Sequence, residues 1–122
     1  MSGSRYLADT NAFIYLLQKH PRIQSLLEAA WSYSFVTEIE LLGKPGISPF
    51  EIQLIKNLLK INSKVLHSDS IDERAILLKR QYNLKTPDAI IAGTAQHLDI
   101  PLLTADAGFL KIKKLDIILI EL

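Results

Sequence analysis

Short apolar blocks alternate with longer amphipathic segments along the whole chain. The short blocks predict strands, and they cover residues 5–8, 33–37, 64–67, 101–104 and 116–122. The longer segments carry apolar residues three and four positions apart, which predicts helices over 11–18, 21–30, part of 37–46, 49–59, 71–82 and 87–98. Strands that alternate with helices predict an α/β fold with a parallel sheet covered on both faces. The last block is apolar on both faces, which is typical of a buried strand.

Two helix starts have the spacing of a capping box. Ser48 precedes Pro49 and Glu51, so we expect the serine to cap a helix whose first position is the proline and whose third is the glutamate. Ser70 and Glu73 repeat this spacing and predict a second cap. These signals place a helix on each side of the third predicted strand.

Composition and charge restrict the class of protein but do not indicate a function. The chain has 122 residues, 48% of them hydrophobic, and no linker or internal repeat, so we expect one domain over 1–122. The absence of cysteine excludes disulfides, thiolate metal sites and a cysteine nucleophile. No apolar run is long enough to span a bilayer, so we expect a cytoplasmic protein with no membrane partner. The net charge of +1 by itself predicts no partner.

Asp9 is the first residue along the chain whose surroundings suggest a functional role. It lies between two apolar blocks, where a carboxylate is costly unless it is paired, hydrogen-bonded or bound to a metal. Three more acids are predicted at the same edge of the sheet, outside the carboxyl ends of the strands. Glu40 is in the helix after the second strand, Asp88 starts the helix that leads to the fourth strand, and Asp106 follows that strand.

Carboxylates that cluster repel one another and need a counter-charge. Oxygen ligands suit Mg²⁺ or Mn²⁺, and a metal held by carboxylates activates water for attack on a phosphodiester bond. We therefore predict that these four acids are the metal ligands and catalytic residues of a hydrolase. Each also has a structural alternative: Asp88 suits the first turn of a helix, Asp106 suits a turn, and Glu38 competes with Glu40.

Four motifs resemble those of PIN-domain ribonucleases in order and spacing. They are LADTNAFIYLL from residue 7, TEIELLG from 37, LKTPDAIIAGTA from 84 and LLTADAGFLKI from 102. Within that family the chain resembles the VapC toxins of toxin–antitoxin pairs, over about residues 5–122. Thr37, followed three residues later by Glu-Leu, fits the family pattern with Glu40 rather than Glu38.

The resemblance implies a three-layer α/β/α sandwich with a mostly parallel sheet of about five strands in the order 3-2-1-4-5. It implies a toxin that is an endoribonuclease, which cleaves single-stranded RNA with Mg²⁺ or Mn²⁺ held by the residues Asp9, Glu40, Asp88 and Asp106. The polar residues that support this site are Thr10, Asn11 and Thr104. The family also implies a homodimer and an antitoxin that inserts a peptide segment into the acidic groove.

A lysine-rich turn follows Asp106. We expect Lys111, Lys113 and Lys114 to bind the RNA backbone near the metal, with an ordinary solvated turn as the alternative. The three histidines are scattered in the sequence, and structural roles are expected for them.

Two other classes are compatible with these residues. A receiver-like phosphoacceptor domain has a similar length and an acidic Mg²⁺ pocket, and Asp69 lies at the phosphoacceptor position. Such a domain needs an acid pair after the first strand and a lysine after the fifth, whereas this chain has Asp9 alone and ends in IEL. A non-catalytic binding module with the PIN fold is the second alternative, and an RNA cleavage assay distinguishes it.

Overall fold

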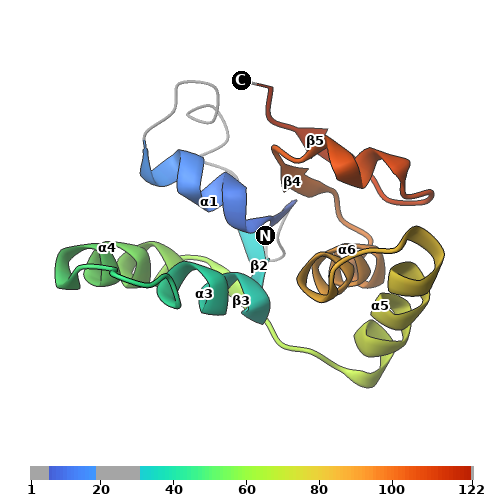
Figure 1. The fold of residues 1–122 in the computed structure, drawn as a ribbon, viewed down its shortest axis with the longest axis horizontal. Coiled ribbons are helices and arrows are strands. Elements are labelled where there is room, and N and C mark those ends of the chain that lie inside the picture. The colour runs from blue at the N-terminus through green and yellow to red at the C-terminus, as the bar shows by residue number, and fades with distance from the viewer. Residues whose placement is uncertain (1–5, 19–30, 122) are drawn as a thin grey trace.

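The computed structural model describes residues 6–18 and 31–121, which contain a five-stranded sheet in the order β3-β2-β1-β4-β5 (Figure 1). The strands are β1 (Tyr6–Ala8), β2 (Trp31–Ser34), β3 (Ser63–Val65), β4 (Leu102–Thr104) and β5 (Ile117–Leu119). All neighbouring pairs are parallel. The predicted order 3-2-1-4-5 is therefore confirmed, and the described sheet is parallel throughout. The predicted helix over 21–30 and His20 lie outside the described residues.

This strand order also tests the receiver-like alternative. Receiver domains have the order 2-1-3-4-5, in which the third strand lies next to the first. Here β1 lies between β2 and β4, and β3 is at the edge of the sheet beside β2. The topology is therefore that of a PIN-like fold and not of a receiver domain.

Helices cover both faces of the sheet, as predicted for a three-layer sandwich (Figure 1). One layer contains α1 (Thr10–Leu17) and α4 (Pro49–Lys60), and the other contains α5 (Asp69–Tyr82) and α6 (Thr86–Leu98). The short α3 (Phe35–Leu42) contributes Val36 to one core and Leu41 to the other. A 3-10 helix, η1 (Ala107–Lys111), connects β4 to β5.

Alternating residues of the central strands separate the two cores. Leu7 and Leu102 pack with α5 and α6, whereas Ala8 and Leu103 pack with α1 and α4. This follows from strand geometry, since successive side chains point to opposite faces of a sheet. Phe13 of α1 lies edge-to-face against Trp31, with ring centroids 5.3 Å apart. The central strands are thus buried on both sides, which fixes the position of the segments that follow them.

α5 and α6 pack closely enough to require a small residue between them. The predicted apolar stripe of α5 is buried at Ile71, Ala75 and Leu78. A Cβ atom added at Gly93 of α6 would lie 3.0 Å from the Ala75 backbone nitrogen and 3.3 Å from the Ile71 carbonyl oxygen. This packing holds α6 against the sheet, with its first turn at the carboxyl edge.

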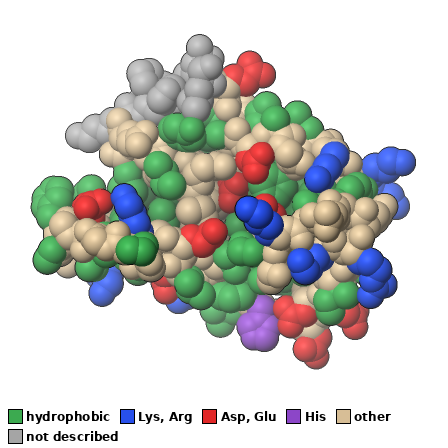
Figure 2. All heavy atoms as spheres, viewed as in Figure 1, with side chains coloured by type: hydrophobic (Ala, Val, Ile, Leu, Met, Phe, Trp, Pro, Cys, Tyr) green, Lys and Arg blue, Asp and Glu red, His purple; other side chains and the backbone are tan. Residues whose placement is uncertain are grey.

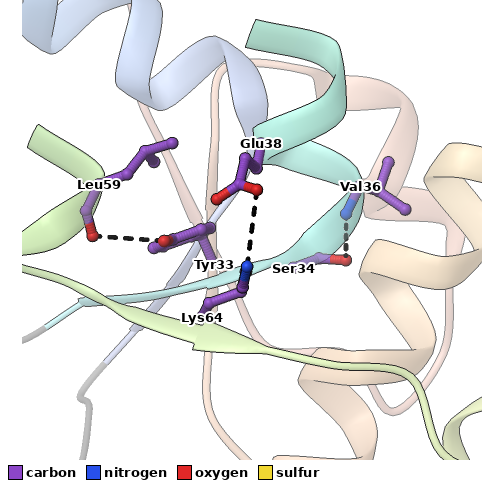
Figure 3. Close-up of polar contacts among 6 residues, drawn as sticks. All are labelled: Tyr33, Ser34, Val36, Glu38, Leu59 and Lys64. Atoms are coloured by element: carbon purple, nitrogen blue, oxygen red, sulfur yellow. Dashed lines mark hydrogen bonds and ion pairs between the residues drawn. The ribbon is translucent and has the colours of Figure 1, made fainter. Parts of the chain in front are cut away.

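The predicted second strand is too long at its carboxyl end. β2 ends at Ser34, and the residues from Phe35 onward are helical. The Ser34 hydroxyl accepts a hydrogen bond of 3.2 Å from the Val36 backbone N–H and caps α3 (Figure 3). The cap outweighs the strand propensity of phenylalanine and valine, because it satisfies a backbone donor at the helix start.

Of the two predicted caps, one is confirmed and one is wrong. Glu51 N–H donates to the Ser48 hydroxyl at 3.1 Å, and Ser48 N–H donates to the Glu51 carboxylate at 3.3 Å, which completes the capping box of α4. In α5 the cap is Ser68, whose hydroxyl accepts from Ile71 N–H at 3.2 Å. Ser70 is already inside the helix. Both Ser68 and Ser70 could cap this helix. Ser68 does so because it is the last residue with an extended backbone.

The two edge strands are shorter than predicted. β3 ends at Val65, so His67 lies beyond it; this exposed side chain is 3.1 Å from the Asp72 carboxylate. β5 is half-buried rather than buried, because the described residues place a neighbouring strand on only one side of it. None of the helices within 6–18 and 31–121 is both long and apolar enough to cross a membrane.

Candidate active site

Asp9 is held in one orientation at the end of β1. It is 5% exposed and caps α1, and its Oδ1 accepts a hydrogen bond of 2.8 Å from the Thr10 backbone N–H. Its Oδ2 accepts from the Thr104 hydroxyl at 2.8 Å and from the Asn11 amide at 3.2 Å. These contacts meet the need of a buried carboxylate for hydrogen bonds, but none of them neutralises its charge.

Asn11 and Thr104 join the end of β1 to the segment that follows β4. Asn11 Oδ1 accepts from the Ala105 backbone N–H at 2.9 Å, and the Thr104 hydroxyl accepts from the Asp106 backbone N–H at 3.0 Å. Asp106 then begins η1, where its Oδ1 accepts from Gly108 N–H at 2.8 Å. The predicted turn role of Asp106 and its position beside the site are therefore compatible.

The structure distinguishes the two glutamates of α3. Thr10 Oγ1 donates to Glu40 Oε1 at 2.6 Å and lies 3.2 Å from the hydroxyl of Thr37, which is fully buried. Glu38 instead faces β3, where its carboxylate lies 3.5 Å from Lys64 Nζ (Figure 3). Only Glu40 is connected to the segment that carries Asp9.

Asp88 lies half-buried in the first turn of α6, after Pro87. Its pKa is raised by burial, then by the charges of Asp106 and Glu40, while the charge of Lys85 lowers it. Burial likewise raises the pKa of Asp9 to about 6; hydrogen bonds from Thr104 and Thr10 oppose this rise, and the charges of Asp88 and Glu40 increase it. The four predicted acids therefore share one electrostatic neighbourhood.

The four acids are neighbours, but they do not lie close enough together for all of them to bind one metal ion directly. Within the described residues, no three Asp, Glu, His or Cys side chains lie close enough together to hold a metal ion between them. This differs from a set of four direct ligands. It agrees with the chemistry of Mg²⁺, which is usually held by one or two carboxylates and completes its coordination with waters and substrate phosphates. The donor set contains only oxygen, so it suits Mg²⁺ or Mn²⁺ rather than a softer metal.

A family model for the PIN domain matches residues 6–115. The chain belongs to the PIN-domain family. No curated protein matches it.

Solved structures similar to this PIN domain include chains of a toxin–antitoxin complex and of VapBC assemblies. A chain of a toxin–antitoxin complex from Klebsiella pneumoniae is 28% identical with a TM-score of 0.82, over 95% of this chain and 98% of that one. A chain of VapBC-1 from nontypeable Haemophilus influenzae is 25% identical with a TM-score of 0.79, over 93% and 96% of the two chains. A chain of DNA-bound VapBC from Salmonella typhimurium has a TM-score of 0.84 at 16% identity, over 95% and 98%, and this likeness shows the fold alone.

Two cavities of the PIN domain adjoin the acids. The first, of about 300 Å³, is lined by Asp88 and Asp106 together with Lys85 and Lys111. The second, of about 380 Å³, lies between α1, α3 and α4, and its lining includes Thr10 and Glu40. Figure 2 shows acidic side chains in the middle of the molecular surface that faces the viewer, between the two helical layers. The site is thus open on two sides, one lined by both acids and lysines and one largely apolar.

The predicted lysines do not form one group. Lys111 lines the cavity that contains Asp88 and Asp106, whereas Lys113 and Lys114 line a different cavity. Sequence reasoning placed all three near the metal because they are close in sequence. The chain turns after η1, and this separates Lys111 from the other two.

Three residues near the site were not predicted from the sequence to belong to it. Thr37 contacts Thr10, and its signal was a threonine three residues before Glu40. Lys85 lines the acidic cavity, and its position three residues before Asp88 could have indicated this. Ser34 starts the helix that carries Glu40, but serine is too common for its position to be a signal.

Proposed function

We propose that this PIN domain is a metal-dependent endoribonuclease and the toxin of a toxin–antitoxin pair. The observation that carries the proposal is the state of Asp9. Its carboxylate is buried and held by hydrogen bonds, and the described residues provide no ion pair for it. Burial raises its pKa, and the charges of Asp88 and Glu40 raise it further. A structural acid in such a position would be paired with a lysine or arginine.

Of Asp9, Glu40, Asp88 and Asp106, one or two would bind Mg²⁺ or Mn²⁺ directly, and the others would hold it through water. The bound cation would supply an activated water and would neutralise charge on the phosphate. Thr104 and Asn11 orient Asp9, and Thr10 orients Glu40. Lys85 and Lys111, on the wall of the cavity that contains Asp88 and Asp106, are in place to attract the RNA phosphate.

An antitoxin partner and a cytoplasmic location belong to the same proposal. The Klebsiella pneumoniae and Haemophilus influenzae structures are assemblies with an antitoxin, and they share this fold over nearly their whole length. The 380 Å³ cavity beside Glu40 is lined by apolar residues of α1 and α4, which suits an antitoxin segment that reaches the acids. A homodimer is proposed on the family resemblance.

Cleavage of single-stranded RNA by the purified protein tests the nuclease proposal. We expect cleavage with Mn²⁺ or Mg²⁺ and none with EDTA, with products that carry a 5′-phosphate and a 3′-hydroxyl. Equal cleavage in EDTA would contradict the metal mechanism. No cleavage with either metal would favour the non-catalytic binding module.

Expression in bacteria tests the toxin proposal. We expect the wild type, expressed alone, to arrest growth, and we expect Asp88→Ala to restore it, because the variant removes one of the four acids. Colony counts after induction measure the effect, with the soluble protein of both strains matched by immunoblot. Equal growth of the two strains at matched protein would argue against a toxin.

A further inference from the structure

A second polar cavity lies next to the acidic cavity, along α5. It measures about 290 Å³ and is formed by α5, the end of α6 and the segment before β5. This cavity is called here the α5–α6 pocket. The polar side chains that line it are Arg74, Gln81, Tyr82, Gln96, Lys113 and Lys114. Asp88 and Gln96 are eight residues apart on α6, which corresponds to about 12 Å along the helix axis. The Gln96 side of the pocket is therefore remote from Asp88, and the two cavities share no lining residue.

Hydrogen bonds hold the backbone of the two lysines in place. Lys113 N–H donates to the Tyr82 hydroxyl of α5 at 3.0 Å. The Gln96 amide of α6 lies 3.2 Å from the Lys113 carbonyl oxygen and 3.4 Å from that of Lys114, and it donates to both. These bonds tie the segment before β5 to both helices, while the charged ends of the lysines remain exposed. The lysines are therefore positioned by the fold, unlike those of a free surface turn.

The charge of the α5–α6 pocket is not balanced. Its lining has three cationic residues and no acid, and within the described residues Arg74, Lys113 and Lys114 form no ion pair. Figure 2 shows Lys and Arg side chains gathered on the side of the molecule formed by α5, α6 and the segment before β5. Such a concentration of positive charge attracts a polyanion.

We propose that the α5–α6 pocket binds a backbone phosphate of the RNA substrate away from the bond that is cut. The proposal rests on the nuclease function. Lys111 lines the acidic cavity and Lys113 lines this pocket, so the segment 111–114 connects the two with positive charge. Arg74 offers the planar set of donors that suits a phosphate. The pocket would thus increase affinity for long RNA without contacting the reacting atoms.

Binding of RNA by charge-matched variants tests this proposal. Arg74→Gln with Lys113→Gln removes two charges from the pocket; Lys114 is left unchanged because its φ of 61° is left-handed. The control, Lys56→Gln with Lys60→Gln, removes two exposed charges from α4. Fluorescence anisotropy with a labelled single-stranded RNA, in EDTA to prevent cleavage, gives the dissociation constant at several salt concentrations.

We expect the pocket variant to bind long RNA about tenfold more weakly than wild type at low salt, and to lose about 0.7 in salt slope for each phosphate contact removed. The control should bind as wild type does, and a trinucleotide should bind all three proteins equally. Equal loss in the control would assign the effect to net charge and overturn the proposal. An equal loss for the trinucleotide, or no loss at all, would also overturn it.

The same proteins separate this proposal from the nuclease proposal. Cleavage of the trinucleotide with Mn²⁺ is expected at the same rate in the pocket variant and in wild type. A wild type that binds long RNA through the pocket but cleaves nothing would contradict the nuclease function alone. A wild type that binds no RNA would overturn both proposals.

Discussion

Asp9→Asn should lower the rate of Mn²⁺-dependent RNA cleavage by at least ~100-fold, the effect of removing a positioned catalytic group. The substitution keeps the size of the side chain and an oxygen for the Thr10 N–H. It removes the charge, and its amide adds a donor where Thr104 and Asn11 already donate. Single-turnover rates at saturating Mn²⁺ and RNA measure the loss, and circular dichroism checks that the variant is folded. A rate within a few-fold of wild type would exclude Asp9 from catalysis.

The two glutamates of α3 provide a matched control for this prediction. Glu40→Gln should also lose most of the cleavage activity, because Glu40 is bound to Thr10 beside Asp9. Glu38→Gln makes the same chemical change two residues away, but it only removes an exposed ion pair with Lys64, which contributes about 1 kcal/mol or less. It should therefore keep the wild-type rate. Equal losses in the two variants would point to damage to α3 rather than to a site at Glu40.

The free energy of unfolding in EDTA should fall as the pH rises from about 4 to 7, with Asp9 contributing up to ~3 kcal/mol. The folded-state pKa of Asp9 is about 6, above its ordinary value of 3.8. The folded state therefore holds this proton more tightly than the unfolded state. The resulting stability is fully present below pH 3.8 and is lost as the pH rises through 6. The raised pKa of Asp88 acts in the same direction.

Urea unfolding of wild type and Asp9→Asn across this pH range isolates the contribution. All other titrating groups are common to both proteins, so the difference between the two curves reports Asp9. We expect the variant to lose less stability with rising pH than wild type does. Parallel curves would show that Asp9 titrates in the folded protein as it does in the unfolded chain.

Metal should reverse the loss of stability at neutral pH. A cation that binds only the folded state stabilises it by about 2.7 kcal/mol at one hundred times its dissociation constant. Thermal melts with Mn²⁺ and with EDTA should show this gain in wild type and little of it in Asp88→Asn. In EDTA the variant should be as stable as wild type or more so by roughly 0.5–2 kcal/mol, because a like charge is removed. A metal-insensitive wild type, with a destabilised variant, would identify structural acids.

The sequence by itself determined the alternation of strands and helices, the capping box at Ser48, and the prediction that four acids meet at one sheet edge. These follow from local rules and from the direction of parallel strands, which bring the end of one strand and the start of the helix feeding the next to the same edge. The order 3-2-1-4-5 was known only through the family resemblance, since local pattern does not select strand neighbours.

Only the tertiary structure decided which of several similar residues occupies each position. Ser34 and Ser68 are the caps because the extended chain ends at these residues. The local pattern instead favoured a strand beyond Ser34 and a cap at Ser70. Glu38 and Glu40 are two positions apart on one helix, so they face different neighbours, and only the packing of α1 beside α3 shows that Glu40 faces the site. The lysines after Asp106 were divided between two cavities by the turn that follows η1. Choices of this kind depend on contacts between segments distant in sequence, which no local pattern contains.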